Sequence, residues 1–343
     1  MSETSSVAAP KPWARRSFFA SLAALVLTLG VAACGGTVIA PGSGWRVAEV
    51  PPEGSQPAIG LRIFSPCDQA AKAPFAPGPF AIDTTPGCPI AGSDKLPLIV
   101  MSHGRGGNFH AHHDTATALA RAGFLVAALS HPGDESSDLS NSDDISVLYH
   151  RPAQVKRVID FMLSSAAPES ARIDAQRIGF FGFSRGGNTG MVLAGATPDF
   201  ANTNLPCPAG MKICDQITGN QIPDLPLVTD KRIKAMAIAD PLSFFPTPES
   251  VKNVKIPIQM WGSQLGGDGV TPESVALLAK NMAHNTEFTV IPNTNHYSYL
   301  HPCTPALAAI APEICTQDPA GLDRPAMHLE WNVRMAMFFK QKL

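Results

Sequence analysis

The pentapeptide Gly182-Phe183-Ser184-Arg185-Gly186 constrains this chain more than any other stretch. The apolar run 177–183 before the serine predicts a buried strand, and the glycine- and alanine-containing run 190–196 predicts a buried helix. Small residues two positions before and after the serine suit a sharp strand-to-helix turn, because larger side chains would collide there. The helix N-terminus would favour negative charge near the hydroxyl. The pattern therefore predicts a nucleophile elbow with Ser184 as the nucleophile.

Strands and helices alternate along most of the chain. Apolar runs predict strands at 59–64, 96–102, 124–130, 177–183, 233–239, 256–261 and 287–291. Periodic segments predict helices at 114–122, 152–164, 190–196, 272–283 and 326–340, the second with Pro152 near its first turn. This alternation predicts an α/β fold with a mostly parallel central sheet covered by helices on both faces. The strand at 59–64 is expected to be antiparallel and at the sheet edge.

The N-terminal segment is typical of an export signal. Lys11, Arg15 and Arg16 precede an uncharged stretch at 18–33, which is short for a membrane span and ends at Cys34. The residues before Cys34 resemble a bacterial lipobox, in which the cysteine receives lipid and becomes the mature N-terminus. We expect a signal peptide at 1–33, a lipidated Cys34, a tether at 34–44 and a single domain at 45–343. The protein would then be exported and anchored to a membrane, facing the periplasm or the cell exterior.

The remaining cysteines agree with an oxidising compartment. They form three sequence-local couples in proline-rich loops, which predicts the disulfides Cys67–Cys88, Cys207–Cys214 and Cys303–Cys315. A zinc site is disfavoured, because no Cys-x-x-Cys spacing occurs. The formal net charge of -2 provides no basic face, so nucleic acid is not expected as a partner.

Two further loops should lie beside Ser184, since parallel sheets place their sites at the carboxyl ends of strands. Ser102-His103-Gly104-Arg105-Gly106-Gly107 follows a predicted strand, and glycines there let the backbone approach a ligand. The backbone N–H groups of Arg105 and Arg185 would form the oxyanion hole. His296 follows the last predicted strand and is the best-placed general base.

Two aspartates could orient His296. Asp268 follows the strand at 256–261, and Asp240 follows the strand at 233–239. Both fit the chain order nucleophile, acid, histidine. Asp268 is the preferred acid, and Asp240 is the alternative.

Several motifs together resemble a known family. They are the glycine-rich loop at 102–107, His131-Pro132-Gly133-Asp134, Arg151-Pro152-Ala153-Gln154, the elbow, and the stretch from Asn295 to Cys303. In this order they resemble bacterial dienelactone-hydrolase-like esterases, which are α/β-hydrolases related to platelet-activating-factor acetylhydrolases. The resemblance covers residues 61–340. It implies the α/β-hydrolase fold and serine-dependent hydrolysis of carboxylic esters, on small esters, phthalate esters or polyesters.

The resemblance has two departures. Dienelactone hydrolases have cysteine as the nucleophile where this chain has Ser184, so dienelactone is not expected as a substrate. The acetylhydrolases place the acid where Asp240 stands, whereas most of the bacterial group place it where Asp268 stands.

Other features have open interpretations. His110, His112, His113 and Asp114 could suggest a metal, but a helix start with solvated histidines is favoured, so no metal or cofactor is expected. The side chains of Arg105 and Arg185 could bind a substrate carboxylate or pair with acids such as Asp134 or Asp240. The segment 197–230 is either a cap over the pocket or a plain surface loop. Alternative functions are a phospholipid-directed acetylhydrolase or phospholipase, and a non-enzymatic anchored lipoprotein.

Overall fold

A computed structural model describes residues 42–343, apart from residues 72, 204, 208–209 and 283. The signal peptide, Cys34 and most of the tether at 34–44 lie outside these residues and stay predictions. The end of the tether does not match the structure, because strand β1 (Gly42–Val50) already begins at Gly42. A Cβ at Gly42 would lie 2.0 Å from the carbonyl oxygen of Gln69. Glycine at this position therefore permits close packing of a strand.

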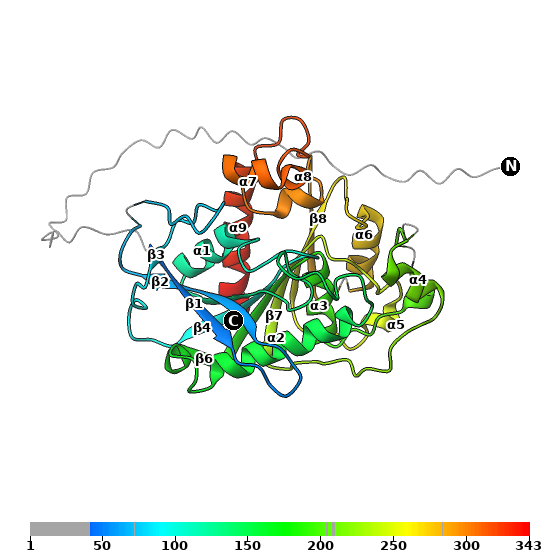
Figure 1. Cartoon of the computed structure of the whole chain (residues 1–343), viewed down its shortest axis with the longest axis horizontal. Helices are drawn as coiled ribbons and strands as arrows, with labels where there is room; N and C mark the ends of the chain where they lie inside the picture. Colours follow the sequence, from blue (N-terminus) through cyan, green and yellow to red (C-terminus); the bar gives the residue numbers. More distant parts are fainter. Residues whose placement is uncertain (1–41, 72, 204, 208–209, 283) are drawn as a thin grey trace, which may run out of the picture. The chain divides into compact units, whose positions relative to one another are not determined.

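The described strands form a single sheet. Their bounds are β1 Gly42–Val50, β2 Ile59–Cys67, β3 Thr85–Pro86, β4 Leu96–Ser102, β5 Leu125–Leu129, β6 Ile173–Phe183, β7 Ile233–Ala239, β8 Ile258–Ser263 and β9 Thr286–Ile291. Their order in the sheet is β3-β1-β2-β5-β4-β6-β7-β8-β9. Figure 1 labels most of these strands. All neighbours from β5 to β9 pair in parallel, as predicted. Strand β2 is antiparallel as predicted, but its predicted edge position is wrong, because β1 and β5 flank it.

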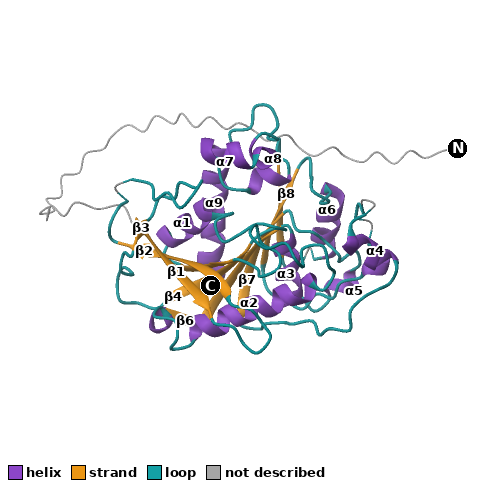
Figure 2. Cartoon of the chain, in the orientation of Figure 1, coloured by secondary structure: helices purple, strands orange, loops and turns teal. Residues whose placement is uncertain are grey.

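Helices cover the strands on both sides (Figure 2). Their bounds are α1 His113–Arg121, α2 Val147–Leu163, α3 Arg185–Leu193, α4 Lys212–Thr218, α5 Pro248–Val251, α6 Pro272–Asn281, α7 Pro305–Ile310, α8 Pro312–Cys315 and α9 Arg324–Lys342. Short 3-10 helices are η1 Ser170–Arg172, η2 Phe200–Asn202 and η3 His296–Tyr299. None of the described helices has both the length and the apolarity needed to cross a bilayer.

Helix α2 begins earlier than predicted, at Val147, so Pro152 lies inside the helix and not in its first turn. The proline removes one backbone donor, which normally destabilises a helix interior. The preceding turn is nevertheless helical because Val147 and Leu148 are buried in an apolar cluster with Ile213 and Phe244. Tertiary packing therefore outweighs the local preference.

The central strands β4, β5, β7 and β8 are buried and mainly apolar along almost their whole length, because both faces of the sheet are covered there. In β6, Ile178 and Phe180 belong to a core cluster that includes residues of α2, α3 and α6. Phe181 and Phe183 belong to a second cluster that includes residues of α1 and α9. Because successive side chains of a strand point to opposite faces of the sheet, β6 contributes to the hydrophobic clusters on both faces.

The three predicted disulfides are confirmed. The structure contains Cys67–Cys88, Cys207–Cys214 and Cys303–Cys315, which span 21, 7 and 12 residues of sequence. Each one therefore closes a short segment, and the Cys67–Cys88 bond joins the end of β2 to the residues just after β3.

Helix α9 offers a matched test of the core. Met335 is fully buried, whereas Met337 is 65% exposed. Met335→Ala should lower the free energy of unfolding by about 2–5 kcal/mol, because it removes buried contacts and leaves a cavity. Met337→Ala should change it by less than about 0.5 kcal/mol. Urea unfolding of both variants checks this, and equal losses would contradict the packing of α9 described here.

Candidate active site

Ser184 occupies a strained turn between β6 and α3. Its backbone has φ 54° and ψ -118°, a conformation that non-glycine residues rarely adopt. A Cβ at Gly182 would lie 2.3 Å from the Gly186 carbonyl oxygen, and one at Gly186 would lie 2.1 Å from the Ser102 carbonyl oxygen. The two glycines are thus required by the close approach of three backbone segments. The turn has the geometry of a nucleophile elbow.

The structure pairs His296 with Asp240. Nδ1 of His296 lies 2.9 Å from Oδ2 of Asp240, and both side chains are 1% exposed. Ser263 donates to the same carboxylate twice, from its backbone N–H at 2.7 Å and from its hydroxyl at 2.6 Å. Asp240 is therefore held from two sides and aimed at one nitrogen of the imidazole.

The preferred acid, Asp268, is not the partner of His296 in the structure. Asp268 is exposed and belongs to the loop after β8, whose backbone supports the histidine. The N–H of His296 donates to the carbonyl of Gly266 at 2.9 Å, and a Cβ at Gly267 would lie 3.2 Å from Cβ of His296. The loop was correctly placed beside His296, but its contribution is backbone contact and not a carboxylate.

Ser263 is a site residue that sequence reasoning missed. It lies at the end of β8, and its hydroxyl accepts the N–H of Gly266 at 3.1 Å while donating to Asp240. Ser263 therefore connects the loop that supports His296 with the acid that orients it. A serine ending an apolar strand was the one available signal, and such a signal has low specificity.

The second nitrogen of His296 is available for chemistry. Nε2 is buried and has no hydrogen-bond partner among the residues that the structure describes. The ring stacks on Phe183, with centroids 4.6 Å apart, which fixes its plane beside the residue that precedes Ser184. With Nδ1 bonded to Asp240, Nε2 is the nitrogen that can accept a proton.

The backbone amides of Arg105 and Arg185 lie on two segments that meet at Ser184. Arg185 is the first residue of α3, so its N–H has no acceptor within the helix. A Cβ at Gly104 would lie 3.4 Å from Cβ of Ser184 and 3.0 Å from the ring of Phe183. The glycine-rich loop thus packs directly against the elbow, as the oxyanion-hole hypothesis requires.

A buried carboxylate joins this loop to the elbow. Asp134 contacts Nε of Arg151 at 2.8 Å and Nη1 of Arg185 at 2.7 Å, and all three side chains are at most 3% exposed. Its Oδ1 accepts the backbone N–H of Gly106 at 3.1 Å and the hydroxyl of Ser142 at 2.7 Å. Burial alone would raise the pKa of Asp134, but the two guanidinium groups and the hydrogen bonds outweigh it and lower the pKa.

Arg151 also holds the carbonyls of the glycine-rich loop. It donates to the carbonyl oxygens of His103 at 2.7 Å and of Gly104 at 2.9 Å. Through Arg151 and Asp134, helix α2 fixes the backbone on both sides of Arg105. The motifs around Asp134 and Arg151, which the sequence resemblance singled out, thus support the glycine-rich loop.

Two neutral histidines fill the space beneath this loop. Burial, followed by the charge of Arg151, lowers the pKa of His103 to about 3, and the same two causes lower the pKa of His131. Nε2 of His103 accepts the backbone N–H of His131 at 3.1 Å, so Nδ1 donates to the Gly104 carbonyl at 2.6 Å. His131 lies between the Ser102 hydroxyl and the Gln154 amide oxygen, at 2.7 Å from each. These histidines are structural and do not compete with His296 for a catalytic role.

Ser184 lines a pocket of about 150 Å³ with mainly apolar walls. Its other lining residues are Arg105, Arg185, Leu205, Pro206, Cys207, Met211, Ile213, Cys214, Ile217, Leu242, Phe244, Asp268 and Gly269. The stretch from Leu205 to Ile217, with its disulfide, belongs to the segment 197–230. This position beside Ser184 favours the cap interpretation over a plain surface loop.

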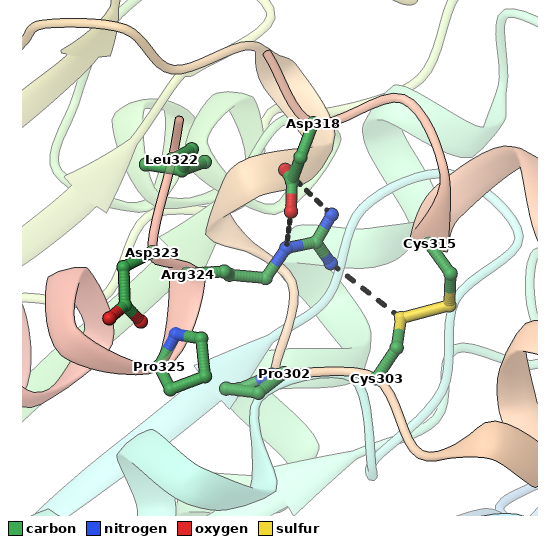
Figure 3. A pocket seen from close by; sticks show the side chains of 8 residues that line it. All are labelled: Pro302, Cys303, Cys315, Asp318, Leu322, Asp323, Arg324 and Pro325. Atoms are coloured by element: carbon green, nitrogen blue, oxygen red, sulfur yellow. Dashed lines mark hydrogen bonds and ion pairs between the residues drawn. A yellow bond between two sulfur atoms is a disulfide. The ribbon is translucent and has the colours of Figure 1, made fainter. Parts of the chain in front are cut away.

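A larger hollow of about 410 Å³ lies at the Cys303–Cys315 disulfide (Figure 3). Neither Ser184 nor His296 lines it. Arg324, which is 4% exposed, donates to both carboxylate oxygens of Asp318, at 2.8 and 2.9 Å (Figure 3). Asp318 in turn accepts the hydroxyl of Ser298, in the turn that carries His296, at 3.0 Å. The hollow therefore borders a support of the turn that carries His296, and two of its charged residues, Asp318 and Arg324, are paired with each other.

The histidines at 110–113 have a packing role in the structure. Burial lowers the pKa of His112 and His113 to about 3 and that of His110 to about 4, so all three are neutral near pH 7. Asp114 lies in the first turn of α1, where its carboxylate contacts Nδ1 of His328 at 2.7 Å. Within the described ranges, no three potential metal ligands are grouped to hold an ion.

Comparison with known proteins gives a partial family match. Residues 61–148 match the family model of platelet-activating factor acetylhydrolase, isoform II. The matched segment contains the glycine-rich loop and Asp134 but ends before the elbow. No curated protein sequence matches the chain.

Two solved structures are similar to this one. A ferulic acid esterase from Streptomyces cinnamoneus has a TM-score of 0.60 and 17% identity, over 91% of this chain and 92% of that chain. A dienelactone hydrolase from Anabaena variabilis has a TM-score of 0.44 and 13% identity, over 80% of this chain and 95% of that chain. The first likeness, together with the sheet order, shows that the chain has the predicted α/β-hydrolase fold.

The buried carboxylate provides a test of the site's architecture. Asp134→Asn should lower the free energy of unfolding by about 3–5 kcal/mol, because Arg151 and Arg185 would be left buried without a countercharge. Denaturant unfolding measures the loss. Glu249→Gln removes an exposed ion pair on α5 and should have an effect below about 1 kcal/mol. Similar values for the two variants would show that Asp134 does not support the site.

Proposed function

We propose that this protein is a serine hydrolase of carboxylic esters that acts through an acyl-enzyme. The observation that carries the proposal is the His296–Asp240 pair, buried beside a strained Ser184 that lines a pocket. Ser184 is the nucleophile, His296 the general base and Asp240 the acid. The partial match to an acetylhydrolase family supports ester hydrolysis.

The geometry suggests the course of the reaction. Asp240 accepts the Nδ1–H of His296 and thereby leaves Nε2 unprotonated toward the serine. His296 removes the hydroxyl proton as Ser184 attacks the ester carbonyl, and returns it to the leaving alcohol. The backbone N–H groups of Arg105 and Arg185 stabilise the oxyanion, each by about 3 kcal/mol. Water activated by His296 then releases the acid and restores Ser184.

The pocket favours esters with one compact apolar group. Its volume of about 150 Å³ and its wall of leucine, isoleucine, methionine and phenylalanine side chains suit a short alkyl chain or a single ring. Small esters fit this description, and phthalate esters or the chain end of a polyester are further candidates. The ferulic acid esterase that shares the fold is consistent with an aromatic ester.

A phospholipid-directed acetylhydrolase or phospholipase is the second candidate, and the family match to residues 61–148 favours it. Such an enzyme would prefer vesicle-bound phospholipid over soluble aryl esters. Anchoring at a membrane would suit it.

Export and anchoring belong to the same proposal. The sequence at 11–34 has the charged, apolar and cysteine elements of a lipoprotein signal. Three disulfides also suit an oxidising compartment. Metabolic labelling with a fatty acid should mark the protein at Cys34, and a Cys34→Ser variant should lose the label.

A fluorophosphonate probe tests the nucleophile. We expect one adduct, which peptide mass spectrometry maps to Ser184, together with hydrolysis of short p-nitrophenyl esters. Ser184→Ala should lose both the adduct and the activity. Folded protein that is neither labelled nor active on soluble esters or phospholipid vesicles would instead support a non-enzymatic lipoprotein.

Substitution of each aspartate tests which of the two orients His296. Asp240→Asn should lower kcat by about 10³–10⁴-fold, because His296 would lose the group that fixes its tautomer. Asp268→Asn should lower kcat by less than about tenfold. Steady-state kinetics on one short ester measures both values. A larger loss in Asp268→Asn would reverse the assignment of the acid.

A further inference from the structure

Arg105 is the arginine without a partner in the described part of the chain. Its side chain makes no hydrogen bond, ion pair or cation–π contact with another described residue. Every other arginine there makes at least one such contact. Arg105 is also exposed and lines the pocket that contains Ser184. An unpaired guanidinium beside the nucleophile is available to a substrate.

Arg185, the other arginine of the pocket, is already bound to groups of the protein. Arg185 is 3% exposed and donates from Nη1 to the Asp134 carboxylate and to the Ser142 carbonyl, both at 2.7 Å. For these two arginines, the sequence left open whether they bind a substrate carboxylate or pair with an acid of the protein. In the structure only Arg185 is paired with an acid. A substrate anion could therefore meet Arg105 but not Arg185.

The pocket divides into an apolar interior and a charged rim. Leu242, Phe244 and Ile213 contribute to the interior, while the exposed Arg105 and Asp268 lie where the pocket meets solvent. A cavity of this size, about 150 Å³, holds one ring or a short alkyl group. A polar group on the same substrate would then extend to the rim.

The rim carries one charge of each sign near the catalytic turn. Burial raises the pKa of Tyr297, the neighbour of His296; Asp268 and Glu313 raise it further, and Arg105 lowers it. Tyr297 is thus within electrostatic reach of both rim charges. Arg105 and Asp268 line the same pocket but form no ion pair with each other in the described part of the chain.

We propose that the side chain of Arg105 binds a carboxylate on the substrate, so that the enzyme favours half-esters of dicarboxylic acids over neutral esters of the same size. Asp268, on the same rim, opposes this preference. The proposal rests on the esterase function above. The backbone N–H of Arg105 would hold the oxyanion of the same substrate whose distal carboxylate its guanidinium binds, so one residue contacts both ends.

Paired substrates test this proposal. The mono-p-nitrophenyl ester of adipic acid carries a free carboxylate, and its methyl ester is the neutral match. The measured quantity is the ratio of kcat/KM for the anionic substrate to that for the neutral one. Because both substrates use the same oxyanion donors, the ratio isolates the effect of the side chain at residue 105.

Arg105→Gln should lower this ratio about fivefold, the size expected for one partly exposed charge pair. Arg105→Lys should retain most of the preference, and Asp268→Asn should raise the ratio. Added salt should lower the ratio in the unmodified enzyme but not in Arg105→Gln, because salt screens an exposed pair. Arg121→Gln, which removes a half-buried arginine of α1 paired with Asp83, is the control and should leave the ratio unchanged.

Two failures are distinguishable. If both esters are hydrolysed with Ser184 labelled, but the ratio is the same in Arg105→Gln as in the unmodified enzyme, the carboxylate proposal is wrong and the esterase function stands. An equal fall in Arg121→Gln would also overturn it, since the effect would then be one of net charge. If neither ester is hydrolysed and Ser184 is not labelled, the esterase function itself fails.

Discussion

The site depends on one fully buried carboxylate. Asp134 receives Arg151 from helix α2, Arg185 from the elbow and the backbone of Gly106 from the glycine-rich loop. Burying three ionised groups is unfavourable by itself, and such clusters often contribute little net stability. Here the cluster fixes the relative position of the two backbone segments that carry the proposed oxyanion-hole amides of Arg105 and Arg185. Removing a single member would leave an uncompensated charge beside the reacting atoms.

The sequence could not decide which aspartate is the partner of His296. Asp240 and Asp268 both follow strands, both precede His296, and both have positive φ, at 43° and 47°. What separates them is distance across the sheet, which depends on how each loop turns after its strand. Ser263, at the end of β8, donates to Asp240, and it is this carboxylate that lies 2.9 Å from Nδ1 of His296. The turn that carries Ser184, the position of His296 and the loop beside them could be predicted, because each belongs to a motif with a strong local geometric requirement.

The fold was predictable for a related reason. Apolar runs of strand length alternate with segments of helical periodicity along the chain. Such an alternation allows few arrangements other than a parallel sheet with helices on both faces. The parts that were missed have weak local signals. Strand β1 begins with Gly-Ser-Gly, which is typical of a tether, yet these residues pair with β2. Helix α2 extends through Pro152 because its first turn is buried against residues from distant parts of the chain.

The backbone of Ser184 has a wider consequence. A serine at φ 54° is less stable there than glycine would be, by roughly 1–3 kcal/mol for a conformation this rare. Selection for folding alone would thus favour glycine at this position, and the proposed nucleophilic role gives the reason for a serine there. A lineage that no longer needed the reaction should lose Ser184 early and gain stability by doing so, while the sheet and the Asp134 cluster persisted.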